Sequence, residues 1–379
     1  MKIIVDNKIP YIKDALEKVA EVVYLPGKKI GRPEVKDADA LIIRTRTRCS
    51  RELLEGSKVK FIATATIGYD HIDTQYCEDA GISWTNAPGC NSASVQQYIV
   101  SALLYLANMK GLDLGKTTVG IVGVGNVGSK VARAARALGC EVMLNDPPRA
   151  ADEGDAEFVG LAALLAKSDI VTLHVPLEAS GPHPTLDMAG PGFFEQMKEG
   201  AVLINSSRGE VVDESALKQA LCTDRISDAV LDVFRDEPVV DRELLSMLTL
   251  ATPHIAGYSA DGKANGTGMS VRAMSRFFKL GLDDWEPKNV PRPSNPELFA
   301  DADDVEELDL VTEMHAATYS VQEDHDRFMD AMERFEQLRG NYRDRREPSA
   351  YNIKLFNDDG KYRGILEGIG FNVLADSCY

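Results

Sequence analysis

The sequence has few of the features that mark secreted, membrane or nucleic-acid-binding proteins. Its six cysteines are scattered among 379 residues without zinc or thioredoxin spacing, which argues against a disulfide scaffold and favours reduced thiols in a cytoplasmic protein. No apolar run approaches about 18 residues, so we expect no membrane span and no secretion signal. Basic residues are also scarce: 42 Lys and Arg stand against 59 Asp and Glu, a net charge of −17. Because such a surface repels phosphate backbones, we expect no nucleic-acid partner.

The remaining composition is that of an ordinary globular chain with an alternating pattern. The length allows two or three domains, and 44% of the residues are hydrophobic. Short apolar runs alternate with amphipathic helical stretches, which is the rhythm of parallel βαβ units. We predict helices at 11–20, 70–79 and 94–108, and strands at 2–6, 40–45, 61–66, 82–86, 118–122, 141–145, 170–175, 201–205, 229–233 and 248–252.

The C-terminal part follows a different pattern. Four prolines between residues 287 and 296 indicate a linker. Beyond it, apolar residues recur at helical spacing, and one predicted helix carries Phe328, Met332 and Phe335. Strand-like stretches follow, the last of them at 371–375. The sequence therefore predicts an α/β protein, with two flavodoxin-like or Rossmann-like doubly wound parallel sheets and a small C-terminal α+β domain.

Residues 117–128, TTVGIVGVGNVG, carry a glycine-rich motif between an apolar strand and a helix. Gly123 permits a tight turn, Gly125 lets the backbone approach a pyrophosphate, and Gly128 lets helix and strand pack closely. The start of the helix then offers free N–H groups to the phosphate. Since strand, glycines and helix occur in the order that the motif requires, the segment predicts a nicotinamide dinucleotide site.

An acidic residue completes this motif. Asp146 follows the next predicted strand, where a carboxylate accepts hydrogen bonds from ribose hydroxyls and repels a 2′-phosphate. This position favours NAD over NADP as the cofactor. Arg149, three residues further on, is a contrary indication.

Three later segments place ionisable groups where predicted strands end. They are residues 205–209 (NSSRG), 232–238 (DVFRDEP) and 252–258 (TPHIAGY). Because ligand sites in open α/β sheets lie at the carboxyl ends of the strands, we expect the three segments to converge.

The residues in these segments suit the oxidation of a secondary alcohol. His254 is a base whose pKa lies near working pH and that can take the hydroxyl proton. The carboxylate of Glu237 can fix the imidazole ring and favour its charged form. The guanidinium fork of Arg208 can hold a substrate carboxylate in a bidentate manner. No residue cluster has metal-ligand spacing, and hydride transfer to a nicotinamide needs no metal.

The motifs GVGNVG, SSRG, DEP and TPHIAG, in this order, resemble those of the D-isomer-specific 2-hydroxyacid dehydrogenases. The segments ATIGYDHID and APGCN resemble the substrate-lobe loops of that family. Further stretches resemble the branch that oxidises 4-phospho-D-erythronate in vitamin B6 biosynthesis: residues 2–11, 146–155, 181–185, 254–267 and 338–347. The resemblance spans essentially the whole chain.

This resemblance implies the domain plan. It implies a substrate-binding domain at 1–93 and 258–286, a Rossmann domain that binds NAD at 94–257, and a C-terminal dimerisation domain at 287–379. The expected assembly is a homodimer.

The resemblance also implies the roles of individual residues. Arg208 and Glu237 would be catalytic, and His254 would be the general acid–base. The cofactor residues would be Gly123, Gly125, Asn126, Val127, Gly128, Asp146, Val175 (through its backbone), Ser206, Ser207, Asp232 and Gly257. The substrate residues would be Thr45, Thr66, Tyr258, Arg44, Arg46 and Gly68, with Ile67 as an equal candidate to Gly68 for the substrate carboxylate.

The phosphate site is left open by the sequence. If the strand predicted at 40–45 continued, its period-2 alternation would place Arg44, Arg46 and Arg48 on one face. Arg345 and Arg346 of the C-terminal part are further candidates, if they reach the active site of a partner subunit.

Two alternatives use the same motifs. A relative such as D-3-phosphoglycerate dehydrogenase often ends in a domain with a βαββαβ pattern, whereas the C-terminal part here begins with helices. An NADH-sensing corepressor of the same fold would bind the dinucleotide without turnover, and it is expected to carry a disordered tail. Turnover of hydroxy acids discriminates between an enzyme and a sensor.

Overall fold

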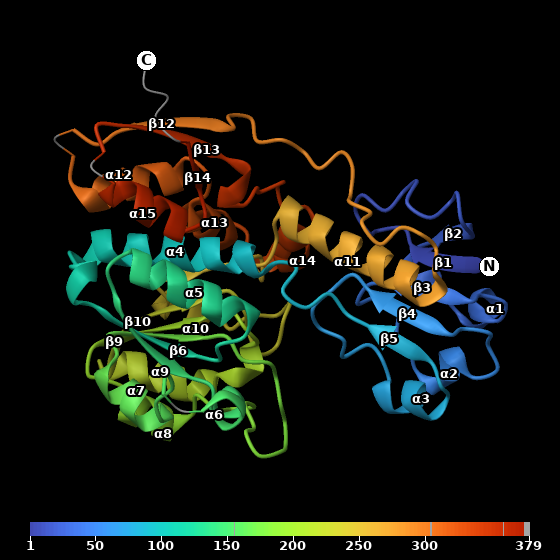
Figure 1. The fold of residues 1–379 in the computed structure, drawn as a ribbon. Helices are drawn as coiled ribbons and strands as arrows, with labels where there is room; N and C mark the ends of the chain where they lie inside the picture. Colours follow the sequence, from blue (N-terminus) through green and yellow to red (C-terminus); the bar gives the residue numbers. More distant parts are fainter. Residues whose placement is uncertain (155, 304, 359, 375–379) are drawn as a thin grey trace. The chain divides into compact units, whose positions relative to one another are not determined.

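The computed structural model describes residues 1–154, 156–303, 305–358 and 360–374. They divide into two compact units. The first unit combines Met1–Asn91 with Ser259–Pro291, and the second combines Ser92–Tyr258 with the described residues from Arg292 on. Parallel sheets with flanking helices confirm the predicted α/β class (Figure 1).

The first unit is built on a parallel sheet with the strand order β2-β1-β3-β4-β5. Four of these strands were predicted within two residues at either end, and β2 was missed. The strands are β1 (Lys2–Asp6), β2 (Glu21–Leu25), β3 (Ala40–Ile43), β4 (Phe61–Thr64) and β5 (Ser83–Thr85), and the helices are α1 (Arg32–Val35), α2 (Arg51–Leu54), α3 (Thr74–Asp79) and α11 (Ala260–Phe278).

The helix predicted at 11–20 is wrong, because this segment forms a series of turns. Tyr11 and Asp14 have φ angles of 59° and 64°, which a right-handed helix does not contain. Ile12 and Leu16 are nevertheless buried, with 2% and 1% of their surface exposed. The helical spacing of apolar residues therefore correctly indicated buried side chains, but it did not indicate a helix.

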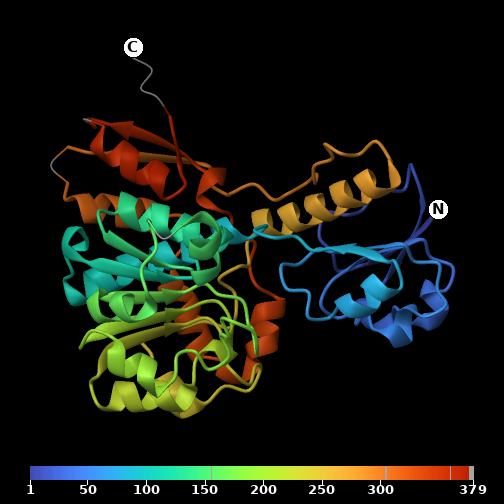
Figure 2. The ribbon, with the colours of Figure 1, turned by 60° about the horizontal axis from the view of Figure 1, so that its bottom comes forward.

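The second unit is built on a parallel sheet with the order β11-β10-β9-β8-β6-β7 (Figure 2). A bridge between Leu144 and Phe158 extends it beyond β7. Strand β6 pairs with both β7 and β8, so β7 is added on one side of β6 and the later strands are added on the other. In such sheets dinucleotides bind at this reversal point of the strand order. The strands are β6 (Thr118–Val122), β7 (Glu141–Asn145), β8 (Ile170–Leu173), β9 (Ala201–Asn205), β10 (Ile226–Leu231) and β11 (Leu250–Ala251).

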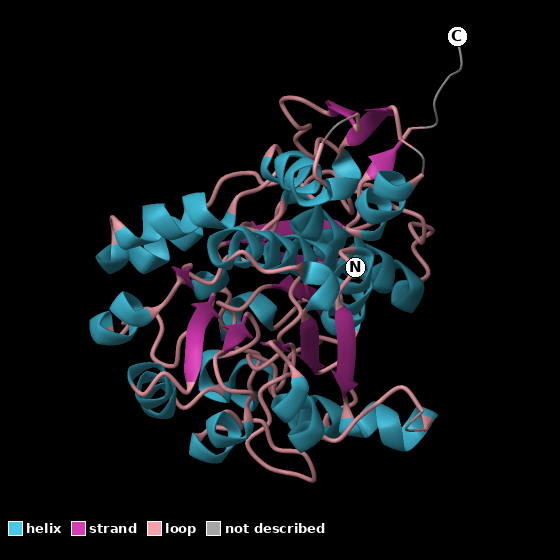
Figure 3. Cartoon of the chain, turned by 90° about the vertical axis from the view of Figure 1, so that its left-hand side faces the viewer, coloured by secondary structure: helices cyan, strands magenta, loops and turns pink. Residues whose placement is uncertain are grey.

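Helices lie on both sides of this sheet (Figure 3). The apolar side chains of α4 and α5 pack on one face, and those of α7 to α10 pack on the other. The helices are α4 (Ser92–Lys110), α5 (Asn126–Ala137), α6 (Pro147–Glu153), α7 (Leu161–Lys167), α8 (Pro191–Gln196), α9 (Glu214–Cys222) and α10 (Arg242–Met247).

The C-terminal segment, orange to red in Figure 1, packs along α4 and α5. Its small parallel sheet has the order β12-β13-β14. The fit is close: a Cβ atom added at Gly368 of α15 would lie 2.3 Å from the Cβ atom of Ala137 in α5. The elements are β12 (Glu297–Asp301), β13 (Asn352–Phe356) and β14 (Asn372–Val373), with α12 (Glu307–Ala316), α13 (Val321–Met329), α14 (Phe335–Gly340) and α15 (Lys361–Gly368).

The structure bears on three sequence expectations for this segment. The single helix predicted to carry Phe328, Met332 and Phe335 is wrong, because Ala331 leaves the helical region at φ −149° and the chain breaks between α13 and α14. The last residue of the strand predicted at 371–375 lies outside the described residues. The predicted separate C-terminal domain stays a prediction, since this segment shares its core with α4 and α5. Among the described residues, no helix combines the length and apolarity that a membrane crossing needs.

Candidate active site

The glycine-rich loop follows β6 at the reversal point of the second unit's sheet. Gly123 has φ 85°, a conformation that side chains rarely adopt. A Cβ atom at Gly128 would lie 2.0 Å from the carbonyl oxygen of Gly123, so only glycine fits there. A Cβ atom at Gly125 would meet nothing within 4 Å. The loop is thus tightly packed on its inner side and open at Gly125, immediately before Asn126 begins α5.

Asp146 connects this loop to the start of α6. Its Oδ2 atom accepts the N–H of Val124 at 2.8 Å, and its Oδ1 atom accepts the N–H of Arg149 at 3.1 Å. The guanidinium of Arg149 forms two hydrogen bonds of 2.7 Å with Glu153 and one of 2.6 Å with the carbonyl oxygen of Val124. Val175, from the loop after β8, would lie 2.8 Å from a Cβ atom at Gly123, so it borders the same loop.

The loop after β9 is shaped by one amide side chain. The Oδ1 atom of Asn205 accepts the N–H and the hydroxyl of Ser207 at 3.0 and 2.8 Å, and its Nδ2 atom donates to the carbonyl of Arg208 at 2.8 Å. The guanidinium of Arg208 donates to the carbonyl of Ser207 at 2.8 Å. The hydroxyl of Ser206 is buried without a hydrogen-bond partner among the described residues.

The loops after β9 and β10 are in close contact, and the second of them carries Glu237, the carboxylate predicted to be catalytic. A Cβ atom at Gly209 would lie 2.0 Å from the carbonyl carbon of Phe234, which explains the glycine. Glu237 accepts the N–H of Phe234 at 3.0 Å with its Oε1 atom. Its Oε2 atom lies 2.7 Å from Nδ1 of His254. The structure therefore brings together the predicted His–Glu pair from two segments 17 residues apart.

The backbone holds His254 in an unusual conformation. Its φ angle is 56°, and its N–H donates to the carbonyl of Asp232 at 2.7 Å. The side chains of His254 and Glu237 are 28% and 18% exposed, so the pair is accessible but largely shielded. With Nδ1–H donated to the carboxylate, the Nε2 atom is the one that can accept a proton.

Asp232 is buried beneath this pair. Its Oδ1 atom accepts the hydroxyl of Thr252 and the N–H of Ile255, both at 2.7 Å, and its Oδ2 atom accepts the N–H of Ala256 at 2.9 Å. Burial raises the pKa of Asp232 to about 6, although the charge of His254 and these hydrogen bonds act in the opposite direction. The carboxyl group of Asp232 is therefore harder to ionise than that of an exposed aspartate.

Several predicted substrate residues lie in the first unit, after β3. The predicted strand face shared by Arg44 and Arg46 is wrong, because β3 ends at Ile43 and the chain turns. Thr45 and Arg46 are exposed in this turn. Arg44 donates to the carbonyl of Lys8 at 3.0 Å.

The loop after β4 holds a second group of predicted substrate residues. The hydroxyl of Thr66 donates to the carbonyl of Gly68 at 2.9 Å and lies 2.7 Å from the hydroxyl of Thr64. His71 lies 3.0 Å from Thr64 through its Nε2 atom, and burial lowers the pKa of this histidine. The loop thus carries a connected set of hydroxyl and imidazole groups.

Tyr258 and Arg345 connect residues 252–258, the candidate catalytic segment of the second unit, to the C-terminal segment. The ring of Tyr258, next to Gly257, is contacted by Arg339 at 5.5 Å and by Tyr342 at 6.2 Å. The side chain of Arg345 is 3% exposed and is hydrogen-bonded within its own unit. The expectation that Arg345 reaches a partner subunit is therefore not supported. Its position under the catalytic segment was missed, and no local sequence signal indicated it.

Comparison with known proteins decides the family. A family model described as the NAD-binding domain of D-isomer specific 2-hydroxyacid dehydrogenases matches residues 95–256. An erythronate-4-phosphate dehydrogenase of Bacteroides fragilis is 55% identical over 356 residues, which are 94% of this chain and 99% of that protein. One from Chromohalobacter salexigens is 41% identical over 392 residues and 100% of both chains. The chain belongs to the erythronate-4-phosphate dehydrogenase family.

A solved structure of another 2-hydroxyacid dehydrogenase has a similar fold. The D-lactate dehydrogenase of Aquifex aeolicus, complexed with NAD and lactic acid, is similar with a TM-score of 0.60 and 26% identity, over 75% of this chain and 97% of that one. As a member of the erythronate-4-phosphate dehydrogenase family, the chain is a dehydrogenase that uses a nicotinamide dinucleotide.

The residues of the second unit fit such a cofactor. The backbone at Gly125 borders open space beside the N-terminus of α5, where the first N–H groups of a helix have no partner within the helix and can bind phosphate. Asp146 stands at the end of β7, the position of the ribose-binding carboxylate in this motif. The buried hydroxyl of Ser206 is a polar atom still available for a ligand.

Proposed function

We propose that this dehydrogenase oxidises the 2-hydroxyl group of 4-phospho-D-erythronate to (R)-3-hydroxy-2-oxo-4-phosphobutanoate, with NAD as the oxidant, in vitamin B6 biosynthesis. The observation that carries the proposal is the similarity to erythronate-4-phosphate dehydrogenases over nearly the whole chain, C-terminal segment included. The histidine–glutamate pair supports the chemistry, because the reaction needs a base for the hydroxyl proton.

Three residues carry the proposed chemistry. The Nε2 atom of His254 takes the proton of the hydroxyl group, while its Nδ1–H remains hydrogen-bonded to Glu237. The carboxylate of Glu237 fixes the ring and stabilises the imidazolium that forms. Arg208 holds the substrate carboxylate with its guanidinium fork. NAD, when bound, supplies the acceptor for the hydride.

The proposed cofactor contacts follow the loops of the second unit. The carboxylate of Asp232 accepts a hydrogen bond from the nicotinamide carboxamide. Asp146 binds the adenosine ribose, and Val175 contributes backbone atoms. The glycine-rich loop and the loops after β9 and β11 complete this set with Gly123, Gly125, Asn126, Val127, Gly128, Ser206, Ser207 and Gly257.

We propose NAD rather than NADP on electrostatic grounds. A carboxylate at Asp146 repels the 2′-phosphate of NADP. Arg149, a nearby cation that favours NADP, already forms a bidentate pair with Glu153. Its charge is therefore compensated before any cofactor binds.

The substrate contacts are proposed for residues of both units. Thr45 and Thr66 offer hydroxyl groups, Gly68 offers a backbone N–H to the carboxylate, and Tyr258 offers a phenol. Arg44 and Arg46 are the proposed partners of the substrate phosphate. A turn that carries two arginines suits a phosphate dianion.

A homodimer is the proposed assembly. The outward face of the β12–β13 sheet carries Phe299 and Phe356, which are 59% and 49% exposed. Exposed aromatic side chains on one sheet face are typical of a protein interface. A cytoplasmic location is also proposed, in keeping with the free thiols of the described cysteines: Cys49, Cys77, Cys90, Cys140 and Cys222.

The proposal is tested by following NADH formation from NAD with 4-phospho-D-erythronate, 3-phospho-D-glycerate and D-lactate in parallel. We expect a kcat/KM at least tenfold higher for the four-carbon phosphate. A 2-oxo acid acceptor is added in a second series, so that slow NADH release does not hide turnover. Preference for 3-phospho-D-glycerate, or NADH binding with no turnover of any acid, would contradict the proposal.

A further inference from the structure

Arg345 places a positive charge inside the second unit, close to the catalytic segment. Its guanidinium donates to the carbonyl of Ala256 at 2.5 Å and to the hydroxyl of Ser94, and lies 3.4 Å from the carbonyl of Ile255. Ser94 itself donates to the same Ala256 carbonyl at 2.8 Å. The residue from the C-terminal segment thus binds the backbone that directly follows His254.

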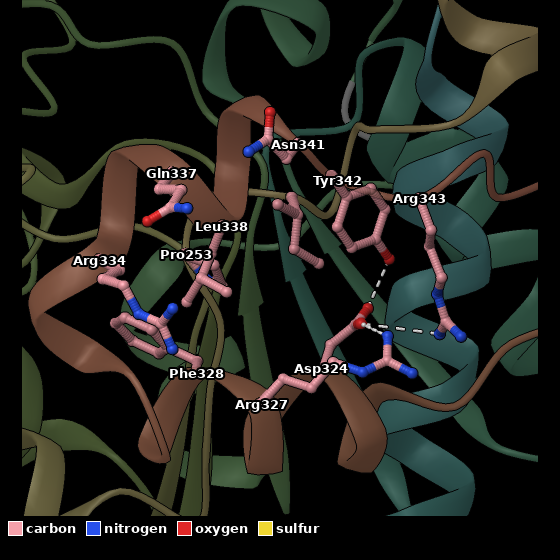
Figure 4. Close-up of a pocket in the computed structure, with 11 residues that line it drawn as sticks. Pro253, Asp324, Arg327, Phe328, Arg334, Gln337, Leu338, Asn341, Tyr342 and Arg343 are labelled. Carbon is pink, nitrogen blue, oxygen red and sulfur yellow. Dashed lines mark hydrogen bonds and ion pairs between the residues drawn. The ribbon is translucent and has the colours of Figure 1, made fainter.

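Aromatic rings keep this guanidinium in place. It lies 4.3 Å from the ring centre of Tyr319 and 5.8 Å from that of Tyr342. The hydroxyl of Tyr342 donates to the buried carboxylate of Asp324 at 2.5 Å. Figure 4 shows that Asp324 also pairs with Arg327 and Arg343, so that the ring of Tyr342 is fixed by charged neighbours.

The backbone of the catalytic segment lies between two opposite charges. The peptide group that joins Ile255 to Ala256 donates its N–H to Asp232 at 2.9 Å, and its carbonyl oxygen faces Arg345. The dipole of this peptide is therefore aligned with the field between the carboxylate and the guanidinium. Removing either charge leaves the other buried beside a peptide oriented for both.

We propose that Arg345 is a positioning residue of the reaction, which fixes the segment after His254 and keeps the carboxylate of Asp232 ionised for the cofactor. The inference rests on the proposed cofactor role of Asp232. It gives the C-terminal segment a part in cofactor binding that does not require a contact with the cofactor.

The electrostatics of the site make this role measurable. Since burial already raises the pKa of Asp232 to about 6, a modest further rise would leave the carboxyl group protonated near neutral pH. A protonated carboxyl group is a poorer acceptor for the nicotinamide carboxamide. The titratable or charged groups that act on Asp232 or Arg345 are His254, Tyr98, Tyr319, Tyr342, Asp324 and His315.

The decisive experiment is an NADH titration of the full-length protein, followed by fluorescence, across pH values on both sides of about 6. In Arg345→Met the positive charge is lost, so we expect the midpoint of the pH dependence to rise by about one unit. NADH binding would then be about tenfold weaker near the original midpoint and little changed at alkaline pH. Arg334→Met, an exposed arginine of the same segment, serves as the matched control and should behave as the wild type.

Coincident midpoints for Arg345→Met and the wild type would overturn the proposal, because a merely structural residue weakens binding equally at every pH. Arg345→Lys decides the matter if Arg345→Met does not fold. Lysine keeps the charge but is shorter and lacks the planar group that lies over Tyr319, so we expect an unchanged midpoint with a several-fold lower kcat. Wild-type kcat in Arg345→Lys would refute the positioning role.

This test is separate from that of the proposed substrate. NADH binding requires no turnover, so it reports on Arg345 even if 4-phospho-D-erythronate is not oxidised. In that case kcat of Arg345→Lys can be measured with another 2-hydroxy acid that the enzyme oxidises.

Discussion

In both units the first three strands of the parallel sheet are arranged in the same order. The residues that follow the first strand nevertheless differ between the two units. In each, the first strand pairs with the second and the third: β1 with β2 and β3, and β6 with β7 and β8. After β6 the chain turns at Gly123 and enters α5 within three residues. After β1 it forms turns until β2 begins at Glu21.

The difference lies in the side chains that fill the reversal point. In the first unit, Ile9, Ile12 and Leu16 are buried against the sheet. In the second unit, glycines keep the backbone close and leave the start of a helix open. Sheet topology thus provides a candidate position in both units, and the absence of Cβ atoms leaves room for a nucleotide at the proposed site of the second unit.

The largest effect should come from replacing one histidine in each unit and comparing the two variants. His254→Gln removes the proposed base, and we expect kcat to fall on the order of a thousandfold or more with NADH binding retained. His71→Gln removes a histidine bonded to Thr64, and we expect less than a tenfold change in kcat. Steady-state kinetics with 4-phospho-D-erythronate measures both variants. Equal losses would show that the catalytic distinction between the units is incorrect.

The charge at the end of β7 should determine cofactor choice. Asp146→Ser keeps a helix-capping oxygen and removes the charge that repels a 2′-phosphate. We expect the preference for NAD over NADP to fall on the order of tenfold to a hundredfold. The ratio of kcat/KM values for the two cofactors is the measurement, and Asp152→Ser, on the exposed side of α6, is the control. An unaltered ratio would argue against this role of Asp146.

The glycines of the loop should separate folding from binding. Gly128→Ala forces a Cβ atom to 2.0 Å from a carbonyl oxygen, so we expect a loss of about 1–3 kcal/mol in the free energy of unfolding. Gly125→Ala meets nothing in the protein, so we expect unchanged stability and about tenfold weaker NADH binding. Urea unfolding and NADH titration separate the two. Gly192→Ala, exposed and likewise without close neighbours, should affect neither measurement.

The last prediction concerns stability in acid, and its effect is absent at neutral pH. Burial lowers the pKa of His174 to about 3 and that of His315 to about 4, from 6.5. Because the unfolded chain binds these protons first, the second unit should lose stability as pH falls below about 6.5, by about 1.4 kcal/mol per pH unit for each histidine. Hydrogen exchange should therefore show protection falling in β6 and β9 before β1 and β3. His315→Leu should lessen this loss, whereas the exposed His183→Gln should not.

Local patterns predicted the parts of the molecule that depend on neighbours in sequence. The strands at 118–122, 141–145 and 201–205 have the predicted bounds, because apolar runs between polar ends leave little choice. The pairing of His254 with Glu237 also follows from strand ends meeting at one edge of the sheet.

The features that failed depend on contacts between distant segments. Burial of Ile12 and Leu16 at helical spacing resembles a helix, and only the positive φ angles of neighbouring residues reveal the turns. The burial of Arg345 requires Ser94 and Tyr319, which lie far away in the sequence. A local sequence pattern cannot show that an arginine between polar neighbours will be buried against residues from distant segments.

The contact between Gly368 and Ala137 limits how this protein can be recombined with its relatives. Because there is no room for a side chain at position 368 unless position 137 gives way, the two positions must be inherited together. A chimera that takes α5 from one relative and α15 from another therefore risks a mismatch, even when both parents are stable. Crossovers that keep both helices from one parent, such as those between residues 1 and 91, avoid this risk.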